Sequence, residues 1–287
     1  MKDQAQGLRA KLKLQSRART IAVVSGKGGV GKSNIALNFS THLAKKNKKV
    51  LLMDLDIGMG NIHILMGKNT NKTIMDLLDG TADIKDIVTE GPEGISYIAG
   101  GTGLRSFVEW SEDKFEIFTD GMRLLQETYD FILFDMGAGA SKESVDLIMT
   151  MDEILLITTP EPTSITDAYS LMKFIFFREG KQKVSVICNR AQQISQGNET
   201  LRRFQNVIDK FLRKHVSILG TIVEDPNVGR AVREQVPFCL QYPKSAASLG
   251  IERIVTLYVN DPIAHHLLPN KPSFVEKLKI LFSRGGE

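Results

Sequence analysis

Cysteines and long apolar runs are scarce in this chain of 287 residues. Its only two cysteines, Cys188 and Cys239, lie far apart and outside any C-x-x-C spacing. Their scarcity argues against a disulfide framework or a structural zinc site, and it favours a reducing cytosol. The first residues hold no apolar core of a signal peptide, and no later run approaches the roughly 18 apolar residues of a spanning helix. We therefore expect a cytoplasmic protein that meets a membrane at its surface at most.

The chain also lacks a broadly basic body, although its formal net charge is +4. Residues 1–20 alone carry a net charge of +5, which leaves the remainder near −1. A near-neutral body argues against a nucleic-acid-binding face, and we expect no specific nucleic acid binding. The basic N-terminus either has a role of its own or is simply solvated.

Short apolar runs that end in turn residues recur at 20–25, 49–54, 94–101, 131–135, 153–158, 183–188 and 218–223. Their hydrophobicity is continuous rather than alternating, as in strands buried on both faces. Helical patterns separate them, for example at 33–46 and 164–180. This alternation predicts an α/β fold, a mainly parallel β-sheet covered by helices on both faces. We expect one domain at 20–268, preceded by a basic segment (1–19) and followed by a helix (269–287).

A glycine-rich loop, "SGKGGVGKSN", follows the first predicted strand and precedes a predicted helix. It contains the P-loop pattern G-x-x-x-x-G-K-[ST], in which glycines turn backbone N–H groups toward phosphate oxygens and the helix adds its dipole. Lys32 is expected to reach the β- and γ-phosphates, and Ser33 to bind Mg²⁺. The predicted nucleotide-binding residues of this loop are Gly26, Lys27, Gly28, Gly29, Val30, Gly31, Lys32, Ser33 and Asn34.

Carboxylates stand at the ends of two further predicted strands. Asp135 ends "FILFD", where a carboxylate near the metal is expected, and the glycines after it permit a mobile loop. Asp54 and Asp56 end "LLMDLD" two residues apart, so they share a face of an extended chain. One is suited to hold metal-bound water and the other to orient an attacking water. The alternative is that each merely caps the next helix.

The segments "KGGVGKS", "DLDIGMGN" and "DMGAG", in this order, resemble the deviant Walker A ATPases related to MinD and ParA, over about residues 20–259. The resemblance implies a slow, switch-type ATPase that uses ATP, ADP and Mg²⁺. It implies an ATP-dependent homodimer in which Lys27 contacts the phosphates of the partner subunit, as an arginine finger does. Lys32 and Asp56 then share the catalytic role, and Asp54 joins Ser33 and Asp135 at the metal. The alternative for Lys27 is a solvated loop lysine.

The resemblance also assigns an adenine site. Asn189 matches the family's asparagine that reads the adenine edge, and the segment that closes over the base corresponds to Glu224, Asp225 and Pro226. Here "IVED" departs from the "IPED" common in relatives, and an asparagine at a strand end is also a common turn residue.

The C-terminal "KPSFVEKLKILFSRGGE" predicts a short amphipathic helix with basic flanks. Its apolar face consists of Phe274, Val275, Leu278, Leu281 and Phe282. The resemblance favours a helix that lies reversibly on the anionic inner face of the cell membrane, with dimerisation doubling the anchor. The alternative is a helix packed on its own body, and ATP-driven release would reconcile the two.

The N-terminal "DQAQGLR" is similar to a motif of the flagellar MinD-like ATPases (FlhG, FleN or YlxH). That resemblance implies docking on the signal-recognition-type GTPase FlhF and stimulation of its GTP hydrolysis, as part of the control of flagellar number and placement. The residues that would bind this partner are Gln4, Gln6, Gly7, Leu8 and Arg9. Without the resemblance, a solvated basic tail is the simpler interpretation.

The phenylalanine-rich segment 171–181 predicts an exposed apolar spot, because Phe174, Ile175, Phe176 and Phe177 cannot all face inward on one helix. With Lys173 and "FLRK" at 211–214 it is a candidate docking patch for flagellar switch (C-ring) proteins. A simple core contact is an equally good interpretation.

Three other functions compete with the flagellar one. A division-site ATPase of the MinD type shares the switch but does not need "DQAQGLR". A DNA-segregating ATPase of the ParA type requires a basic face on the body. A metabolic ligase of this fold requires substrate-binding insertions, and an iron–sulfur relative requires suitably placed thiolates.

Overall fold

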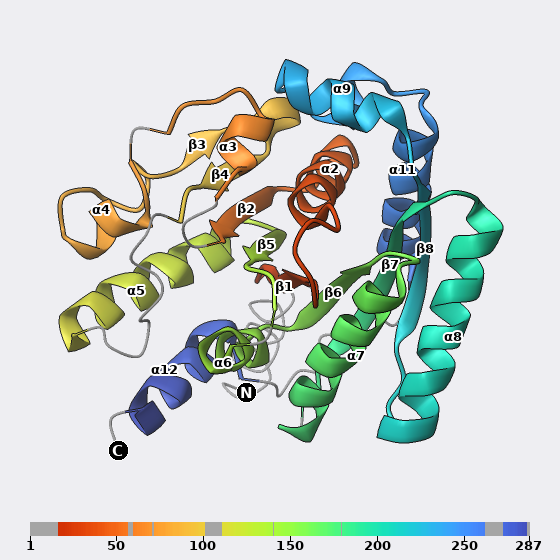
Figure 1. Ribbon diagram of the computed structural model, residues 1–287. Coiled ribbons are helices and arrows are strands. Elements are labelled where there is room, and N and C mark those ends of the chain that lie inside the picture. The colour runs from red at the N-terminus through yellow and green to blue at the C-terminus, as the bar shows by residue number, and fades with distance from the viewer. Residues whose placement is uncertain are drawn as a thin grey trace, which may run out of the picture.

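The computed structural model describes residues 17–56, 60–70, 72–100, 111–139, 141–178, 180–261 and 272–285 (Figure 1). The partner-binding residues predicted at 4–9 lie outside this part of the chain.

Eight strands form one sheet in the order β3-β4-β2-β5-β1-β6-β7-β8. Every pairing is parallel except that of β3 with β4, so the predicted mainly parallel α/β fold is confirmed. The short β3 was not predicted, because two residues carry no periodic pattern. The strands are β1 (Arg19–Val24), β2 (Val50–Leu55), β3 (Thr89–Glu90), β4 (Ser96–Ile98), β5 (Phe131–Met136), β6 (Glu153–Thr158), β7 (Lys183–Ala191) and β8 (Ser217–Val223).

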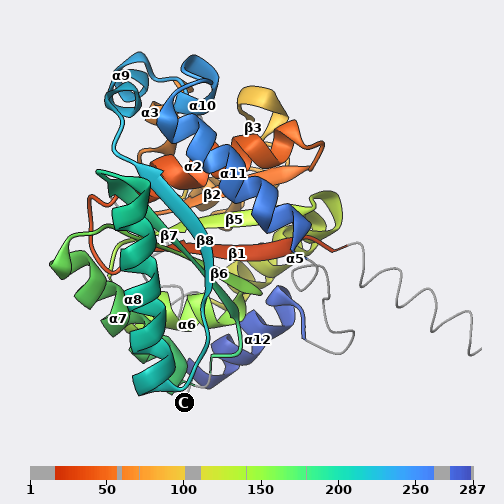
Figure 2. The ribbon, with the colours of Figure 1, turned by 90° about the vertical axis from the view of Figure 1, so that its right-hand side faces the viewer.

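Helices cover both faces of the sheet (Figures 1 and 2). One face packs on α4 (Ile74–Leu78), α5 (Glu112–Thr128), α6 (Lys142–Thr150), α7 (Pro162–Phe177), α8 (Ile194–Leu212) and α12 (Phe274–Gly285). The other packs on α2 (Lys32–Lys45), α3 (Ile62–Leu65), α9 (Pro226–Glu234), α10 (Phe238–Gln241) and α11 (Ala246–Asn260). Neighbouring residues of β1 enter opposite cores, Ala22 on the first face and Ile21 on the second. Burial on both faces therefore explains the continuous hydrophobicity of the strands.

The first strand begins at Arg19, one residue before the apolar run predicted at 20–25. Arg19 opens β1 instead of ending the basic segment, and its guanidinium is buried beside Glu153 and the hydroxyl of Tyr258. A buried carboxylate compensates the charge. Arg19 is therefore not one of the solvated charges of the N-terminus.

The C-terminal helix α12 packs on its own body. Phe274 and Leu278 are fully buried in the core formed with α5 and α6, and Val275 is nearly so. Partly buried Leu281 and Phe282 pack on the same core, where the ring of Phe282 stacks on Phe115 with centroids 4.0 Å apart. The face predicted to lie on a membrane is thus turned inward here, because it finds apolar surface on the body. Within the described residues, no helix is long and apolar enough to cross a bilayer.

Candidate nucleotide-binding site

The predicted site residues come together at the carboxyl ends of the central strands. The P-loop follows β1, Asp54 and Asp56 lie at the end of β2, Asp135 near the end of β5 and Asn189 near the end of β7. Since these strands are parallel, their carboxyl ends share one edge of the sheet, where α/β proteins bind ligands. A cavity of about 970 Å³ opens there, lined by the P-loop and by Asp56.

Two glycines of the P-loop adopt the left-handed region that other residues disfavour. Gly29 has a φ of 79° and Gly31 a φ of 89°, and Gly31 leads directly into α2. A Cβ at Gly26 would lie 2.2 Å from the backbone of Asp167 in α7, so only glycine fits there. The spacing of the motif is thus required by both backbone conformation and packing.

Lys32 is buried at the floor of the cavity. Its Nζ donates a hydrogen bond to Asp135 Oδ1 at 2.6 Å and lies 4.0 Å from Asp56 Oδ2. Burial raises the pKa of Asp135, and the nearby Lys32 opposes this rise. The carboxyl of Asp56 is more exposed than those of Asp54 and Asp135, so it is the one of the three that is open to water.

Asp54 accepts hydrogen bonds from two backbone N–H groups that come after β2. Its Oδ1 accepts from the N–H of Asp56 at 3.1 Å, and its Oδ2 accepts from the N–H of Ile62 at 3.3 Å. Burial, reinforced by the negative charge of Asp135, raises the pKa of Asp54 to about 6. Asp54 therefore has a positioning role in this structure, whatever it contributes to a metal.

Lys27 points away from the cavity of its own chain. Its Nζ lies 3.1 Å from Glu161 Oε2 and 3.1 Å from Thr163 Oγ1, at the start of α7. The side chain is 42% exposed, whereas Lys32 is buried. The two lysines of the loop thus differ in direction as well as in burial.

The predicted adenine end of the site lies beside the P-loop. Asn189 donates from Nδ2 to the carbonyl of Val30 at 2.8 Å. Asp225 caps α9, because its Oδ1 accepts from the N–H of Asn227, and its Oδ2 accepts from the N–H of Ala247 in α11. Glu224 pairs with Arg190, and Pro226 is the first residue of α9. These contacts are structural and leave the adenine assignment as a prediction.

Comparisons with known proteins agree with this geometry. A family model described as ParA, NUBPL iron-transfer P-loop NTPase matches residues 16–258. The chain belongs to this ParA family of P-loop NTPases. It is 30% identical to the antiactivator FleN of Pseudomonas aeruginosa (91% of this chain, 93% of FleN) and 32% identical to the flagellum site-determining protein YlxH of Helicobacter pylori (86% and 83%). The solved structure of the septum site-determining protein MinD with Mg-ADP from Pyrococcus horikoshii superposes with a TM-score of 0.69 at 26% identity, covering 89% of this chain and all of that one.

Membership of the ParA family makes the chain a Mg²⁺-dependent ATPase, as the sequence predicted. The residues fit the metal and the nucleotide. Asp135 Oδ2 is buried and has no hydrogen-bond partner among the described residues, and a metal ion would satisfy it. Ser33 is the second residue of α2, and its side chain is near enough to Asp135 to lower the pKa of that carboxyl. Ser33 and Asp135 would therefore hold Mg²⁺ directly or through water, and the ion would neutralise charge on the transferred phosphoryl group.

The sequence of this ParA-family chain did not single out Glu161, Thr163 or Arg190. Glu161 and Thr163 follow β6, and Arg190 lies near the end of β7, so all three occupy the edge that the parallel sheet assigns to ligands. The rule that ligands bind at the carboxyl ends of parallel strands was therefore the signal in the sequence that could have identified these three residues. Their contacts with Lys27 and Gly29 depend on side-chain directions that a sequence pattern does not carry.

Proposed function

We propose that this chain is an ATP-driven molecular switch that dimerises, binds the inner face of the cell membrane and controls the number and placement of flagella. The main support for an ATP-driven switch is the position of Lys27, whose side chain lies outside the cavity of its own chain. The proposed role in flagellar placement is supported by the similarity to FleN and YlxH over most of the chain.

The geometry of the P-loop supports the proposed dimerisation. A cation that is 42% exposed and does not line the cavity of its own chain can meet a nucleotide that a second subunit presents. Two facing subunits would then each lend Lys27 to the other, which makes ATP a condition for pairing. The transferred phosphoryl group then meets the second cation, Lys27, only in the dimer, whereas Lys32 belongs to its own subunit.

Membrane binding requires that α12 leave the body. Phe274, Val275 and Leu278 of this helix are buried in the structure. Phe274 also lines the cavity and lies 5.2 Å, ring to ring, from Phe134. Asp135 follows Phe134 directly in β5, and α6, on which α12 packs, follows the loop after β5. A change at the phosphates therefore has a short route to the surface that holds α12.

We expect a substitution in the groove to release the helix without ATP. Phe115→Ala removes the ring that stacks on Phe282 but leaves the apolar face of α12 intact. Co-sedimentation of the nucleotide-free protein with anionic vesicles should rise about tenfold, since loss of a buried phenylalanine weakens the docked state. Ile117→Ala on the exposed face of α5 is the matched control and should behave as the parent. If the parent binds vesicles equally with and without ATP, or if removing residues 269–287 changes nothing, the membrane part of the proposal is wrong.

The N-terminal segment is proposed to stimulate the GTPase FlhF. A peptide of residues 1–20 should accelerate GTP hydrolysis by FlhF at least about tenfold, if Gln4, Gln6 and Arg9 order water or phosphate in the partner's site. GTP turnover by purified FlhF with increasing peptide measures this. The stimulatory role is rejected if the peptide does not accelerate GTP hydrolysis, or if a peptide with "DQAQGLR" scrambled accelerates it equally. The main feature that separates this chain from MinD-type division ATPases and ParA-type segregation ATPases would then be lost.

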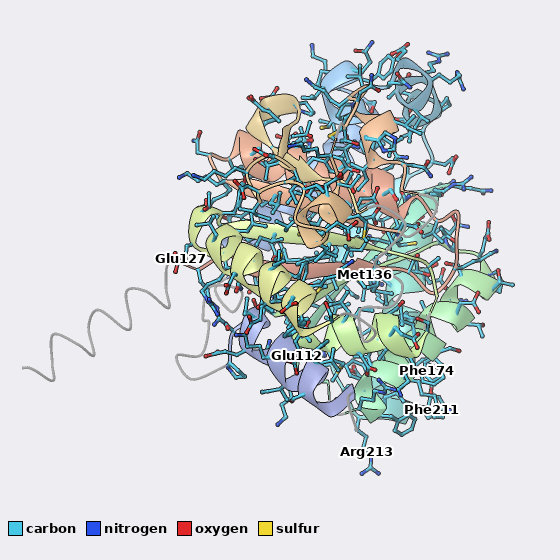
Figure 3. The ribbon with its side chains drawn as sticks, turned by 90° about the vertical axis from the view of Figure 1, so that its left-hand side faces the viewer. Glu112, Glu127, Met136, Phe174, Phe211 and Arg213 are labelled. Atoms are coloured by element: carbon cyan, nitrogen blue, oxygen red, sulfur yellow. The ribbon has the colours of Figure 1, made fainter. Side chains whose placement is uncertain are left out.

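An aromatic-basic patch supports a second docking site, for flagellar switch proteins. Phe174 (57% exposed) and Phe177 (71%) on α7 and Phe211 (64%) on α8 gather at one end of the molecule, as the labels of Figure 3 show for Phe174 and Phe211. Lys173 and Lys210 lie over two of these rings. The exposed apolar spot predicted at 174–177 is therefore present, and it suits an amphipathic, acidic partner segment.

A further inference from the structure

Arg190 has an unusual backbone and two partners at the rim of the nucleotide site. It lies in β7 directly after Asn189, with a φ of 58°. Its Nε donates to Glu224 Oε2 at 2.8 Å, and its Nη1 donates to the carbonyl of Gly29 at 3.2 Å. A left-handed conformation is unfavourable for a residue with a side chain, so the surroundings must hold it there.

The peptide after Gly29 needs a partner that fixes its orientation. The φ of Gly29 is 79°, and apart from Gly29 and its two chain neighbours no atom of the described residues lies within 4 Å of the place where a Cβ would stand. A glycine peptide with so much room can turn over, which would direct its carbonyl instead of an N–H toward a phosphate. Arg190 and Asn189 bind the successive carbonyls of Gly29 and Val30 on the outer side of the loop. Consecutive residues of one strand thus fix consecutive peptides of the P-loop.

We propose that Arg190 is a positioning residue for nucleotide binding, which holds the Gly29 carbonyl outward and ties the P-loop to the segment predicted to close over the base. Glu224 begins that segment and is anchored to β7 by its own N–H, which donates to the carbonyl of Ala191 at 2.8 Å. Glu224 orients the guanidinium, and the guanidinium orients Gly29. A single planar group is required, because the two bonds leave from different nitrogens of one fork.

The position of Arg190 is not explained by stability. About half of the side chain is exposed, and so is about half of Glu224. Surface ion pairs of this kind contribute little to folding. The effect of Arg190 should therefore appear in ligand affinity and not in the melting temperature.

The test is the affinity of the protein for ADP in excess Mg²⁺, which does not require dimerisation. Arg190→Ala should weaken ADP binding about tenfold, the usual effect of one hydrogen bond to a charged group. The affinity of Arg190→Ala for inorganic triphosphate, which has no base, should fall by the same factor, because the peptide after Gly29 would face the phosphates. Arg190→Lys should be about as weak as Arg190→Ala, since an ammonium cannot span both partners. Arg203→Ala, which removes the exposed Arg203–Glu199 pair of α8, is the matched control and should bind as the parent.

A double-mutant cycle tests the link through Glu224. Glu224→Ala should weaken ADP binding in the same direction, and adding it to Arg190→Ala should cause no further loss. Full affinity in Arg190→Lys would overturn the proposal in favour of simple charge attraction. Additive losses of ADP affinity in the double variant would overturn the proposal as well. The same holds if Arg190→Ala loses affinity for ADP but not for triphosphate, or if a lower melting temperature accounts for the lost affinity.

Discussion

Lys27→Ala is expected to abolish ATP-dependent dimerisation and to lower kcat by about 10³-fold, the range over which a cation supplied in trans acts in phosphoryl transfer. The reason is positional: Nζ lies at Glu161 and Thr163, outside the cavity that binds the nucleotide of its own chain. For the same reason, binding of Mg-ADP to the monomer should stay within about twofold of the parent. Light scattering after size-exclusion chromatography and steady-state ATP turnover measure the two effects.

The matched control for Lys27 is Lys72. Lys72 has a similar exposure and a single carboxylate partner, Asp86 at 3.0 Å, but it lies away from the cavity. Lys72→Ala should dimerise and turn over ATP as the parent does. Weakened ADP binding in Lys27→Ala would instead place Lys27 in the site of its own subunit.

Asp56→Ala is expected to trap the ATP-bound dimer, with kcat lowered at least about 10²-fold because no carboxylate remains to orient the attacking water. Asp56 is the one of the three site aspartates that is open to water, and it lies 4.0 Å from Lys32 Nζ, whereas Asp54 is occupied by backbone N–H groups. The variant should therefore still bind ATP. Chromatography in the presence of ATP and Mg²⁺ should show a lasting dimer where the parent returns to monomer as it hydrolyses ATP.

Asp83→Ala, which removes an exposed aspartate outside the cavity, is the control for Asp56→Ala. It should hydrolyse ATP and elute as the parent does. Elution of Asp56→Ala as a monomer with ATP, at unchanged ATP affinity, would mean that nucleotide does not drive pairing.

The sequence predicted the sheet and the position of the site because both depend on local patterns. Continuous apolar runs mark strands buried on both faces, and polar residues at their carboxyl ends must meet at one edge. Asp54, Asp56, Asp135 and Asn189 do meet there. The glycine spacing likewise predicted a loop whose conformations only glycine tolerates easily.

Tertiary contacts account for what the sequence did not predict. The pattern of α12 shows an apolar face but does not state whether α5 and α6 or a membrane covers it. In the sequence, Arg19 is one more cation of a basic tail, because its partner Glu153 comes next to it only in the folded chain. Arg190 carries no motif, and its two partners lie 34 and 161 positions away along the chain.

The central claim is that each subunit completes the other's site with Lys27, and mixing two inactive variants tests it most directly. In a mixed dimer of Lys27→Ala and Asp56→Ala subunits, the site of the Lys27→Ala subunit keeps its own Asp56 and receives Lys27 from its partner. Each mixed dimer holds one complete site of two, so equimolar mixing should raise ATP turnover well above that of either variant, to at most about half of the parent value if every dimer is mixed. If Lys27 served its own subunit, neither site of the mixed dimer would be complete. Turnover that stays at the level of the separate variants, while mixed dimers are seen to form, would contradict the account.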